Sequence, residues 1–434
     1  MRKIAVLLIL ALFISSVYSQ NKLSLSDAIE KGLENNYQIK ITNKRVEQAK
    51  LMNNWGTVGR YPAINLGVNL NNKFDNADSR VNAGERDEWT TNTLYPNINA
   101  RWTVFNGFGI NISKEKLDLL ENYSEGNAAL IIENTIQSIV LAYYQVKLEE
   151  EKLEVMNKVK ALSGDRYNYV MQKFDLGSSV TYDVLQAKNA YLNDSTNYLF
   201  QELNVKNARL NLNLLLGEES SNQYELSDKL YMVAEAYQLG DLIDKMLSDN
   251  KTLQNQYINQ EILKKEVAFK KSSLFPVVSL STGFDHFNFR TKYSGQDASF
   301  TNSYDFYANV SLSFNLFNGG NTRRAIENAQ IDERIGELSI AEIQLQLKNV
   351  LVNMFDLFEI RKQLFEVSES NLESAELNLK LSEEKFKAGV INSFNYRDVQ
   401  LLYLNVATQR LESMYNLIDT HTELVRLTGG IIAE

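Results

Sequence analysis

The chain has 434 residues, a formal net charge of −9, no cysteine and only 3 prolines. The acidic balance argues against a nucleic-acid partner, because nucleic-acid-binding proteins present a basic face. The absence of cysteine excludes disulfides, thiol catalysis and metal sites built on cysteine, and the scarcity of proline favours long uninterrupted helices.

The first segment, residues 1–19, has the pattern of an export signal peptide. Two basic residues follow the first Met, and the apolar run after them is too short to span a bilayer. Val17 and Ser19 supply the small residues that signal peptidase requires, so we expect cleavage after Ser19. The alternative is a buried N-terminal helix. We expect an exported protein that is not a lipoprotein, since no cysteine is available to carry the lipid.

The remainder of the chain consists of two copies of one pattern. Phe105-Asn106-Gly107 recurs as Phe317-Asn318-Gly319, and Tyr191-Leu192-Asn193 recurs as Tyr403-Leu404-Asn405, both at an offset of 212 residues. A constant offset held over such a distance indicates an internal repeat. We therefore expect a first repeat over residues 20–237 and a second over residues 238–434.

Each copy is expected to open with a helix, over residues 23–54 and 239–273, and to continue with two strands. Apolar and polar residues alternate with period two in four segments, which predicts strands with one apolar and one polar face. These segments are 64–71, 97–104, 278–285 and 306–315.

Long helices follow the strands in both copies. Residues 108–174 and 323–386 contain no proline and keep an apolar seam with a 3.5-residue period, which predicts coiled-coil packing. At ~1.5 Å per residue each of these helices is about 100 Å long. The return helices, over 181–216 and 394–428, are half as long. We expect the helix from Leu239 to complete the first return helix and the helix from Leu23 to complete the second, so that the two halves interlock.

The fold class is therefore mainly α with a small β part. Four strands cannot close a barrel, because single-chain membrane barrels begin at about eight strands. Either the strands form a small soluble sheet, or several chains pool them in a membrane. Pooling would make the aromatic residues near the strand ends an interfacial belt, whereas the alternative is ordinary core packing. These aromatic residues are Trp55, Tyr61, Tyr95, Trp102 and Phe105.

The ordered motifs resemble the TolC-like outer-membrane efflux family, the outer-membrane factors. Leu25-Ser26-Asp27-Ala28-Ile29 is similar to the N-terminal signature of that family, and the two Phe-Asn-Gly motifs are similar to its strand-to-helix junctions. Lys173-Phe174 with Gly177 and Lys385-Phe386 with Gly389 are similar to its periplasmic helix turns. The resemblance covers essentially the whole mature chain.

This resemblance implies a homotrimer in the outer membrane of a Gram-negative bacterium. Three chains would form a 12-stranded β-barrel in contact with outer-membrane lipid, and a tunnel of long coiled-coil α-barrel hairpins would extend into the periplasm. The turns would dock a periplasmic adaptor that joins the channel to an inner-membrane pump. The docking residues carried over from the family are Leu176, Gly177, Ser178, Ala388, Gly389 and Val390.

The resemblance also implies a gate at the turns. The family has acidic residues six and nine positions after the second turn glycine, where this chain has Asn395 and Asp398. Asp183 matches the acidic position after the first turn. Phe386 stands where the family has an aromatic hydroxyl, so the gate is expected to depend more on packing than on hydrogen bonds. A ring of three Asp398 side chains would create a negative field, although acids also simply stabilise a first helical turn.

The patterns do not favour an enzyme. His286 and His421 are far apart in the sequence, and there is neither a P-loop nor a G-x-G-x-x-G motif after a strand. We expect no catalytic site, cofactor, metal or nucleic-acid partner. The rival function is a secreted or periplasmic coiled-coil scaffold or adhesin. Within the channel class, efflux and type I protein secretion remain equally open, as does the exported substrate.

Overall fold

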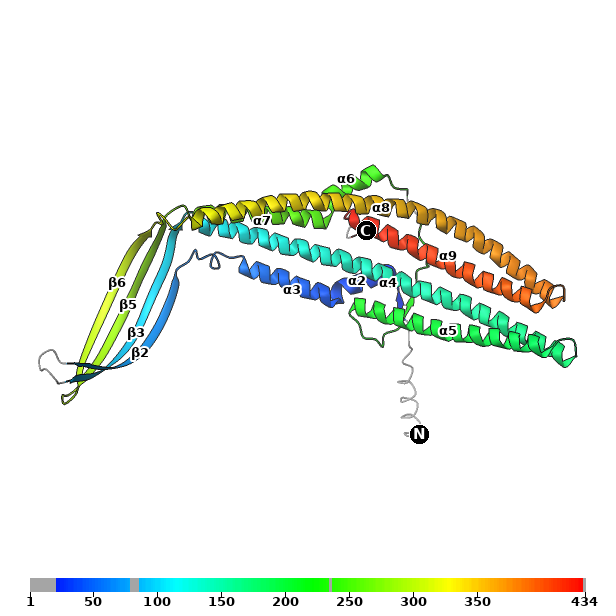
Figure 1. The fold of residues 1–434 in the computed structure, drawn as a ribbon, viewed down its shortest axis with the longest axis horizontal. Coiled ribbons are helices and arrows are strands. Elements are labelled where there is room, and N and C mark those ends of the chain that lie inside the picture. Colours follow the sequence, from blue (N-terminus) through cyan, green and yellow to red (C-terminus); the bar gives the residue numbers. More distant parts are fainter. Residues whose placement is uncertain (1–20, 79–85, 234–235, 432–434) are drawn as a thin grey trace, which may run out of the picture. The chain divides into compact units, whose positions relative to one another are not determined.

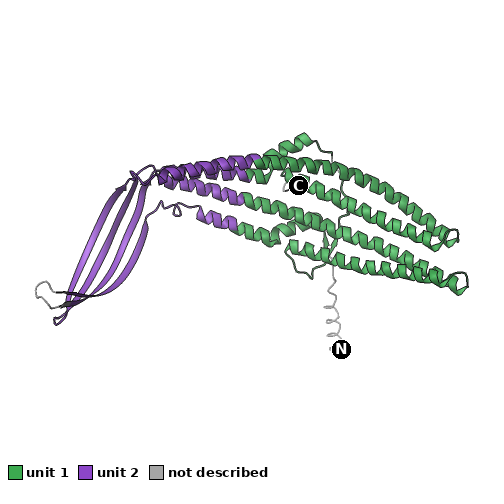
Figure 2. Cartoon of the chain, in the orientation of Figure 1, with its two compact units in different colours: residues 1–44, 126–254, 342–434 green, residues 45–125, 255–341 purple. Residues whose placement is uncertain are grey.

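The computed structural model describes residues 21–78, 86–233 and 236–431 (Figure 1). The expected signal peptide lies outside the described residues. Contacts divide the chain into two compact units (Figure 2). Unit 1 comprises residues 1–44, 126–254 and 342–434, and unit 2 comprises residues 45–125 and 255–341. Among the described residues, none of the helices combines the length and apolar content needed to cross a membrane.

Unit 2 contains an antiparallel sheet of four strands in the order β2-β3-β5-β6. The four expected strands are confirmed and are longer than predicted, although the last one ends at Ser313 and not at Asn315. The strands are β2 (Ala63–Asp78), β3 (Arg86–Asn106), β5 (Val277–Tyr293) and β6 (Ser299–Ser313). Within the described part of the chain, β2 and β6 each pair along one side only, so the sheet has two open edges.

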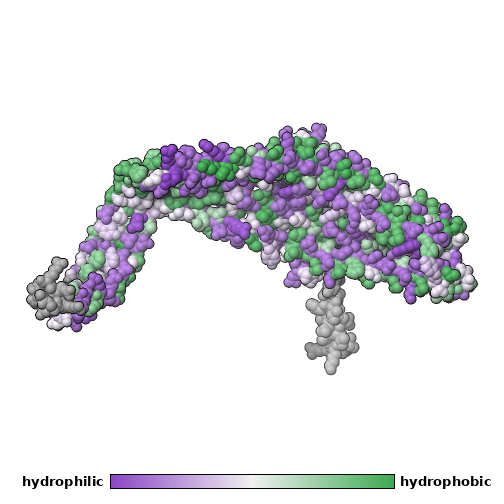
Figure 3. All heavy atoms as spheres, viewed as in Figure 1, coloured by the Kyte–Doolittle hydropathy of each residue, from purple (hydrophilic) through white to green (hydrophobic). Residues whose placement is uncertain are grey.

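One face of this sheet is apolar and uncovered. On β2 the side chains of Ile64, Leu66, Val68 and Leu70 are 63–77 % exposed, although they alternate with polar residues as a half-buried strand would. Hydrophobic residues also gather at the end of the sheet that joins the helices (Figure 3). An apolar surface of this extent is unfavourable in water and indicates a face that meets lipid or protein.

The Phe-Asn-Gly motifs start the two long helices. Asn106 Oδ1 accepts a hydrogen bond from the backbone N–H of Ile110 at 3.0 Å, near the start of α4 (Gly109–Asp175). Asn318 Oδ1 accepts a hydrogen bond from the backbone N–H of Thr322 at 3.4 Å, near the start of α8 (Asn321–Lys387). An asparagine at this position satisfies a backbone donor that the helix itself leaves unpaired. This need explains why the same motif stands before both helices.

Unit 1 contains two helical hairpins. The C-terminal half of α4 pairs with α5 (Thr181–Leu216), and the C-terminal half of α8 pairs with α9 (Ser393–Leu427) (Figure 1). The predicted seam on α4 is confirmed, since Ile136, Ile139, Tyr143 and Val146 are all buried. A core cluster that includes Phe358 and Met414 joins α8 to α9. Tight packing along these seams holds the hairpins together.

Each opening helix is broken by an asparagine. The expected helix over 23–54 is divided into α2 (Leu25–Asn35) and α3 (Tyr37–Met52), with Asn36 between them. The expected helix over 239–273 is divided into α6 (Leu239–Asp249) and α7 (Lys251–Ser272), with Asn250 between them. Asn36 Oδ1 accepts from Gln38 N at 2.8 Å, so the side chain that ends one helix caps the next.

The same asparagines show that the expected stacking order was wrong. Asn36 Nδ2 donates to the Leu215 carbonyl at 2.8 Å, and Asn250 Nδ2 donates to the Leu427 carbonyl at 3.0 Å. Each return helix therefore ends against the opening helices of its own half, and not against those of the other half. Helix lengths could not reveal this, because the two opening segments are nearly equal in length.

A small parallel sheet contains the first described residues. β1 (Asn21–Leu23) pairs with β4 (Tyr224–Leu226), so Leu23 lies in a strand and not in the expected helix. The buried Tyr143 hydroxyl donates to the Leu23 carbonyl at 2.9 Å and accepts from the backbone N–H of Asp228 at 3.2 Å. This hydroxyl therefore links α4 to both segments of the small sheet.

Gly217, which ends α5, permits the close approach of α2. Its φ is 68°, and a Cβ at this position would lie 2.4 Å from the Asn35 carbonyl oxygen. Gly177 has a similar φ of 74°, but nothing lies within 4 Å of a Cβ there.

We expect Gly217→Ala to destabilise the fold by about 1–2 kcal/mol more than Gly177→Ala. Both substitutions place alanine in the left-handed backbone conformation, but only the Cβ at position 217 also clashes with a neighbour. Thermal denaturation measures both variants, and equal losses would show that Asn35 moves aside.

Candidate functional site

The two turns between the hairpin helices have the same construction. The N–H of Ser178 donates to the Lys173 carbonyl at 2.8 Å, and the N–H of Val390 donates to the Lys385 carbonyl at 2.8 Å. Gly177 and Gly389 occupy the left-handed positions with φ of 74° and 75°. This is the Schellman arrangement, which requires glycine at the position after the helix. Both turns lie where the sequence placed them.

The predicted docking residues are exposed on these turns. Leu176 is 83 % exposed and Val390 is 70 % exposed, while Ser178, Ala388 and both glycines are also at the surface. A Cβ added at either glycine would meet open space. Each turn therefore presents an exposed apolar side chain beside a glycine backbone that no described residue covers.

The predicted gate residues lie close to the turns on different elements. Asp183 is in the first turn of α5 and accepts a hydrogen bond from Ser179 Oγ at 3.3 Å. Asn395 and Asp398 are exposed on the first turns of α9, and the Asn395 N–H donates to the Asn392 side chain at 2.9 Å. Among the described residues, no hydrogen bond or ion pair joins the predicted gate residues to one another.

Phe386 is buried in a cluster of aromatic rings. Its ring lies edge-on to Tyr169 with centroids 4.9 Å apart, and it stacks on Tyr396 at 4.8 Å. Burial is the main cause that raises the pKa of the Tyr396 hydroxyl. The Tyr169 hydroxyl also donates to the Lys387 carbonyl at 3.3 Å, so this cluster joins α4 to the end of α8 and the start of α9. Phe386 has no polar group, so its contribution here is the packing of its ring against Tyr169 and Tyr396.

Sequence reasoning missed a buried charged layer that joins the hairpins. Arg397 on α9 makes two hydrogen bonds with Asp194 on α5, at 2.6 and 2.7 Å, and the Asp194 side chain is only 3 % exposed. Arg166 on α4, 3 % exposed, donates to the Ser393 carbonyl at 3.0 Å. Burial is the main cause that lowers the pKa of Arg166 to about 10. A signal was present, because Asp194 stands one heptad from the buried Ala187, at a seam position.

A second buried acid, Glu133, lies on α4. Glu133 is 2 % exposed, and its Oε1 atom has no hydrogen-bond partner. Burial raises the pKa of Glu133 to about 7, while the positive charges of Lys251 and Arg426 partly oppose the shift. A buried carboxyl without full hydrogen bonding is more stable in its neutral form.

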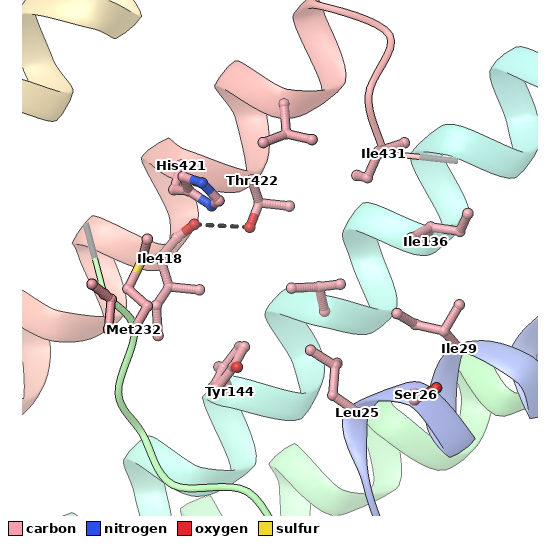
Figure 4. A pocket seen from close by; sticks show the side chains of 13 residues that line it. Leu25, Ser26, Ile29, Ile136, Tyr144, Met232, Ile418, His421, Thr422 and Ile431 are labelled. Carbon is pink, nitrogen blue, oxygen red and sulfur yellow. Dashed lines mark hydrogen bonds between the residues drawn. The ribbon is translucent and has the colours of Figure 1, made fainter. Parts of the chain in front are cut away.

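An apolar hollow of about 400 Å³ lies in unit 1 between α2, α4 and α9 (Figure 4). His421 and Thr422 line it, but both already have partners. The Thr422 hydroxyl donates to the Ile418 carbonyl at 2.8 Å, and the His421 ring is 2.8 Å from the Tyr237 hydroxyl. The hollow therefore offers mainly hydrophobic contact. Within the described ranges, no three His, Asp or Glu side chains gather in a group that would hold a metal.

The fold is similar to that of solved outer-membrane channels. The structure of the outer-membrane channel OprN superposes with a TM-score of 0.73 at 17 % identity, covering 94 % of this chain and 90 % of that one. The Campylobacter jejuni CmeC outer membrane channel gives a TM-score of 0.75 at 13 % identity, covering 94 % and 85 %. At such identities the likeness establishes the fold.

Sequence comparison identifies the family. The chain is 24 % identical to the outer membrane protein TolC of Vibrio cholerae over 234 residues. This match covers 51 % of the chain and 53 % of the relative, so the chain spans about half of that relative's length. The family model described as "Outer membrane efflux protein" matches residues 28–218 and 242–430. Because these two matches fall one in each half and together span most of the sequence, the chain belongs to the outer membrane efflux protein family.

Proposed function

We propose that this chain is a subunit of an outer-membrane channel, the passive exit duct of a tripartite efflux or type I secretion system. The sheet of unit 2 carries this proposal, because it combines an exposed apolar face with two open edges. An open edge cannot face lipid, since its backbone groups would remain unpaired. Three copies that pair β2 with β6 of a neighbour would close a 12-stranded barrel and satisfy both edges.

The repeat supports a ring of equivalent hairpins. We propose that residues 20–237 and 238–434 are two structural repeats, so that a homotrimer has six similar hairpins around one pore. Asn36 and Asn250 support this division, because each makes the same kind of hydrogen bond to the end of the return helix in its own half. The matching turns at Gly177 and Gly389 support it as well.

The turns are proposed to dock a periplasmic adaptor that links the channel to an inner-membrane pump. Leu176 and Val390 project as exposed apolar knobs beside bare glycine backbone, which allows a partner helix to approach closely. The docking set is Leu176, Gly177, Ser178, Ala388, Gly389 and Val390. In this role the chain performs no catalysis.

The gate is proposed to lie beside the turns, where Asp183, Phe386, Asn395 and Asp398 are found. Phe386 would hold the closed form by packing between Tyr169 and Tyr396. Asp398 is exposed on α9, and three copies around the pore axis would concentrate negative charge at the narrowest point.

Membrane fractionation followed by bilayer recording tests the channel function. We expect a trimer that only detergent extracts and that conducts ions in a planar bilayer. A soluble periplasmic monomer without conductance would contradict the proposal. It would instead support the alternative function, a coiled-coil scaffold or adhesin.

Replacing Asp398 with Asn is expected to weaken block of the channel by divalent cations severalfold, because the ring of carboxylates would be lost. The reciprocal variant Asn395→Asp adds a carboxylate one helical turn away and is expected to strengthen the block. Single-channel current against cation concentration measures both. Unchanged block in both variants would remove this part of α9 from the constriction.

A further inference from the structure

Two hollows flank Trp102 on the apolar side of the sheet in unit 2. One, of about 360 Å³, lies across β3, β5 and β6, and the other, of about 320 Å³, lies beside Arg60 and the end of β3. Trp102 lines both of them. Its indole N–H donates to the Arg60 carbonyl at 2.8 Å, which fixes the ring as a wall between the two spaces.

The strand register produces the first hollow as a groove. Ala100, Thr282 and Ala308 stand side by side on three neighbouring strands and form a row of small residues. Bulkier side chains flank this row, including Leu280 and Val310 on the side of Trp102. The Thr282 hydroxyl donates to the Tyr307 carbonyl at 2.8 Å, so its one hydrogen-bond donor is already used. This hollow is therefore an apolar groove on the exposed face of the sheet.

The second hollow is lined by both polar and apolar side chains, and Arg60 gives it a positive charge. Arg60 is exposed, and its guanidinium lies over the Trp55 ring with the Cζ atom 4.3 Å from the ring centroid. In the described part of the chain, no carboxylate lies within ion-pair distance of Arg60. The nearby Lys114 differs in this respect, because Asp118 neutralises it at 2.5 Å. Stacking on the indole holds the Arg60 charge in place and leaves its N–H donors available.

The backbone of Phe108 supports the second hollow at a conformational cost. Its φ is 67°, a region that aromatic residues rarely adopt, and its side chain is 60 % exposed. The ring packs edge-on against Phe105 with centroids 5.3 Å apart, and it forms part of the wall of the hollow. A strained backbone that keeps a large apolar ring at the surface points to a ligand or an apolar environment there.

We propose that these two hollows form one binding site for an anionic glycerophospholipid. The phosphodiester would accept hydrogen bonds from the Arg60 guanidinium, and one acyl chain would lie in the groove of Ala100, Thr282 and Ala308. Trp102 would stand at the boundary between head group and chain, where amphipathic rings are favoured. The inference rests on the proposed function, because it requires the apolar face to meet a lipid leaflet.

The combination of features selects a phospholipid over other ligands. A free anion would use Arg60 but would leave the groove empty, and a neutral hydrocarbon would use the groove but not the charge. An unpaired guanidinium and an adjoining acyl-sized groove are complementary to a molecule with both parts. The groove lies on one chain, across β3, β5 and β6, so it does not depend on the pairing of β2 with a neighbour.

Native mass spectrometry of the purified full-length assembly tests the site with dioleoylphosphatidylglycerol as the probe. Arg60→Gln removes the charge and Ala308→Phe fills the groove without disturbing the backbone. We expect each variant to retain the lipid about tenfold less well than the wild type, since one charge-assisted contact or one chain site is lost. Arg290→Gln is the matched control, because Arg290 lies over Phe300 elsewhere on the same sheet.

The competitors identify which part of the lipid is recognised. Glycerol phosphate that displaced the lipid as well as phosphatidylglycerol does would reduce the site to an anion site and overturn the proposal. Dioleoylglycerol that competed equally would show that the phosphate is not recognised, with the same consequence. Equal retention by Arg60→Gln, Ala308→Phe and the wild type would also overturn it.

Bilayer conductance of the same samples separates this inference from the proposed function. If the wild-type protein conducts but does not prefer phosphatidylglycerol over glycerol phosphate and dioleoylglycerol, the result contradicts the lipid site alone. A protein that neither forms a trimer nor conducts contradicts the channel function itself.

Discussion

Replacing Asp194 with Asn is expected to loosen the start of α9 from the first hairpin. The change preserves the shape of the side chain but removes the carboxylate that, among the described residues, forms the ion pair with Arg397, whose side chain is 15 % exposed. Breaking one partner of a buried ion pair costs about 3–5 kcal/mol, because the remaining charge stays buried without compensation. Arg166, also buried beside this pair, increases the imbalance of charge.

Hydrogen exchange of the α9 peptide over residues 393–403 measures this effect in the purified assembly. A loss of about 3 kcal/mol corresponds to exchange more than ~100-fold faster where local opening limits it. Glu383→Gln is the matched control, because it removes an exposed ion pair with Lys387 on the neighbouring helix. We expect that control to leave exchange unchanged, since exposed pairs contribute little. Unchanged exchange in Asp194→Asn would show that the pair does not hold the hairpins together.

Replacing Glu133 with Gln is expected to stabilise the protein at pH 8 and to have little effect at pH 5. The pKa of Glu133 is raised from 4.5 to about 7 in the fold, so the folded state binds a proton more tightly than the unfolded state. The stabilisation of the fold by this tighter proton binding is fully present below pH 4.5 and is lost as the pH rises through 7. At pH 8 the ionised, buried carboxylate costs about 3 kcal/mol, and Gln avoids this cost.

Thermal denaturation of the wild type and the Gln variant at both pH values provides the measurement. Glu376→Gln, which changes an exposed carboxylate on α8, is the control and should behave as the wild type at each pH. Equal stabilisation of Glu133→Gln at pH 5 and pH 8 would trace the effect to packing and not to ionisation. The wild type itself should denature at a lower temperature as the pH rises from 5 to 8, apart from the contributions of other groups.

The sequence alone determined the four long strands, the hairpin helices and their order. Alternation with period two predicted the four strands, and the 3.5-residue seam predicted the hairpins, because both patterns describe which side of one element is buried. Gly177 and Gly389 placed the turns, since only glycine readily adopts the left-handed backbone that ends each helix. The family was also identifiable, because its motifs recur in order along the chain, and the family model matches both halves.

Other features became visible only when the elements met in space. The two opening helices are alike in length and pattern, so only the hydrogen bonds of Asn36 and Asn250 to Leu215 and Leu427 decided which return helix each one joins. Arg397 and Asp194 lie 203 residues apart in the chain, so the heptad spacing that places Asp194 at a seam position could not show which residue would face it.

The groove beside Trp102 has the same origin. It exists because the strand register aligns Ala100, Thr282 and Ala308, and register joins residues that no local pattern connects. Local periodicity therefore determined the long helices and strands of this protein, because a helix or strand needs only its own residues to define its faces. Partner choice and register required the tertiary structure, because they depend on contacts between distant segments that look alike in sequence.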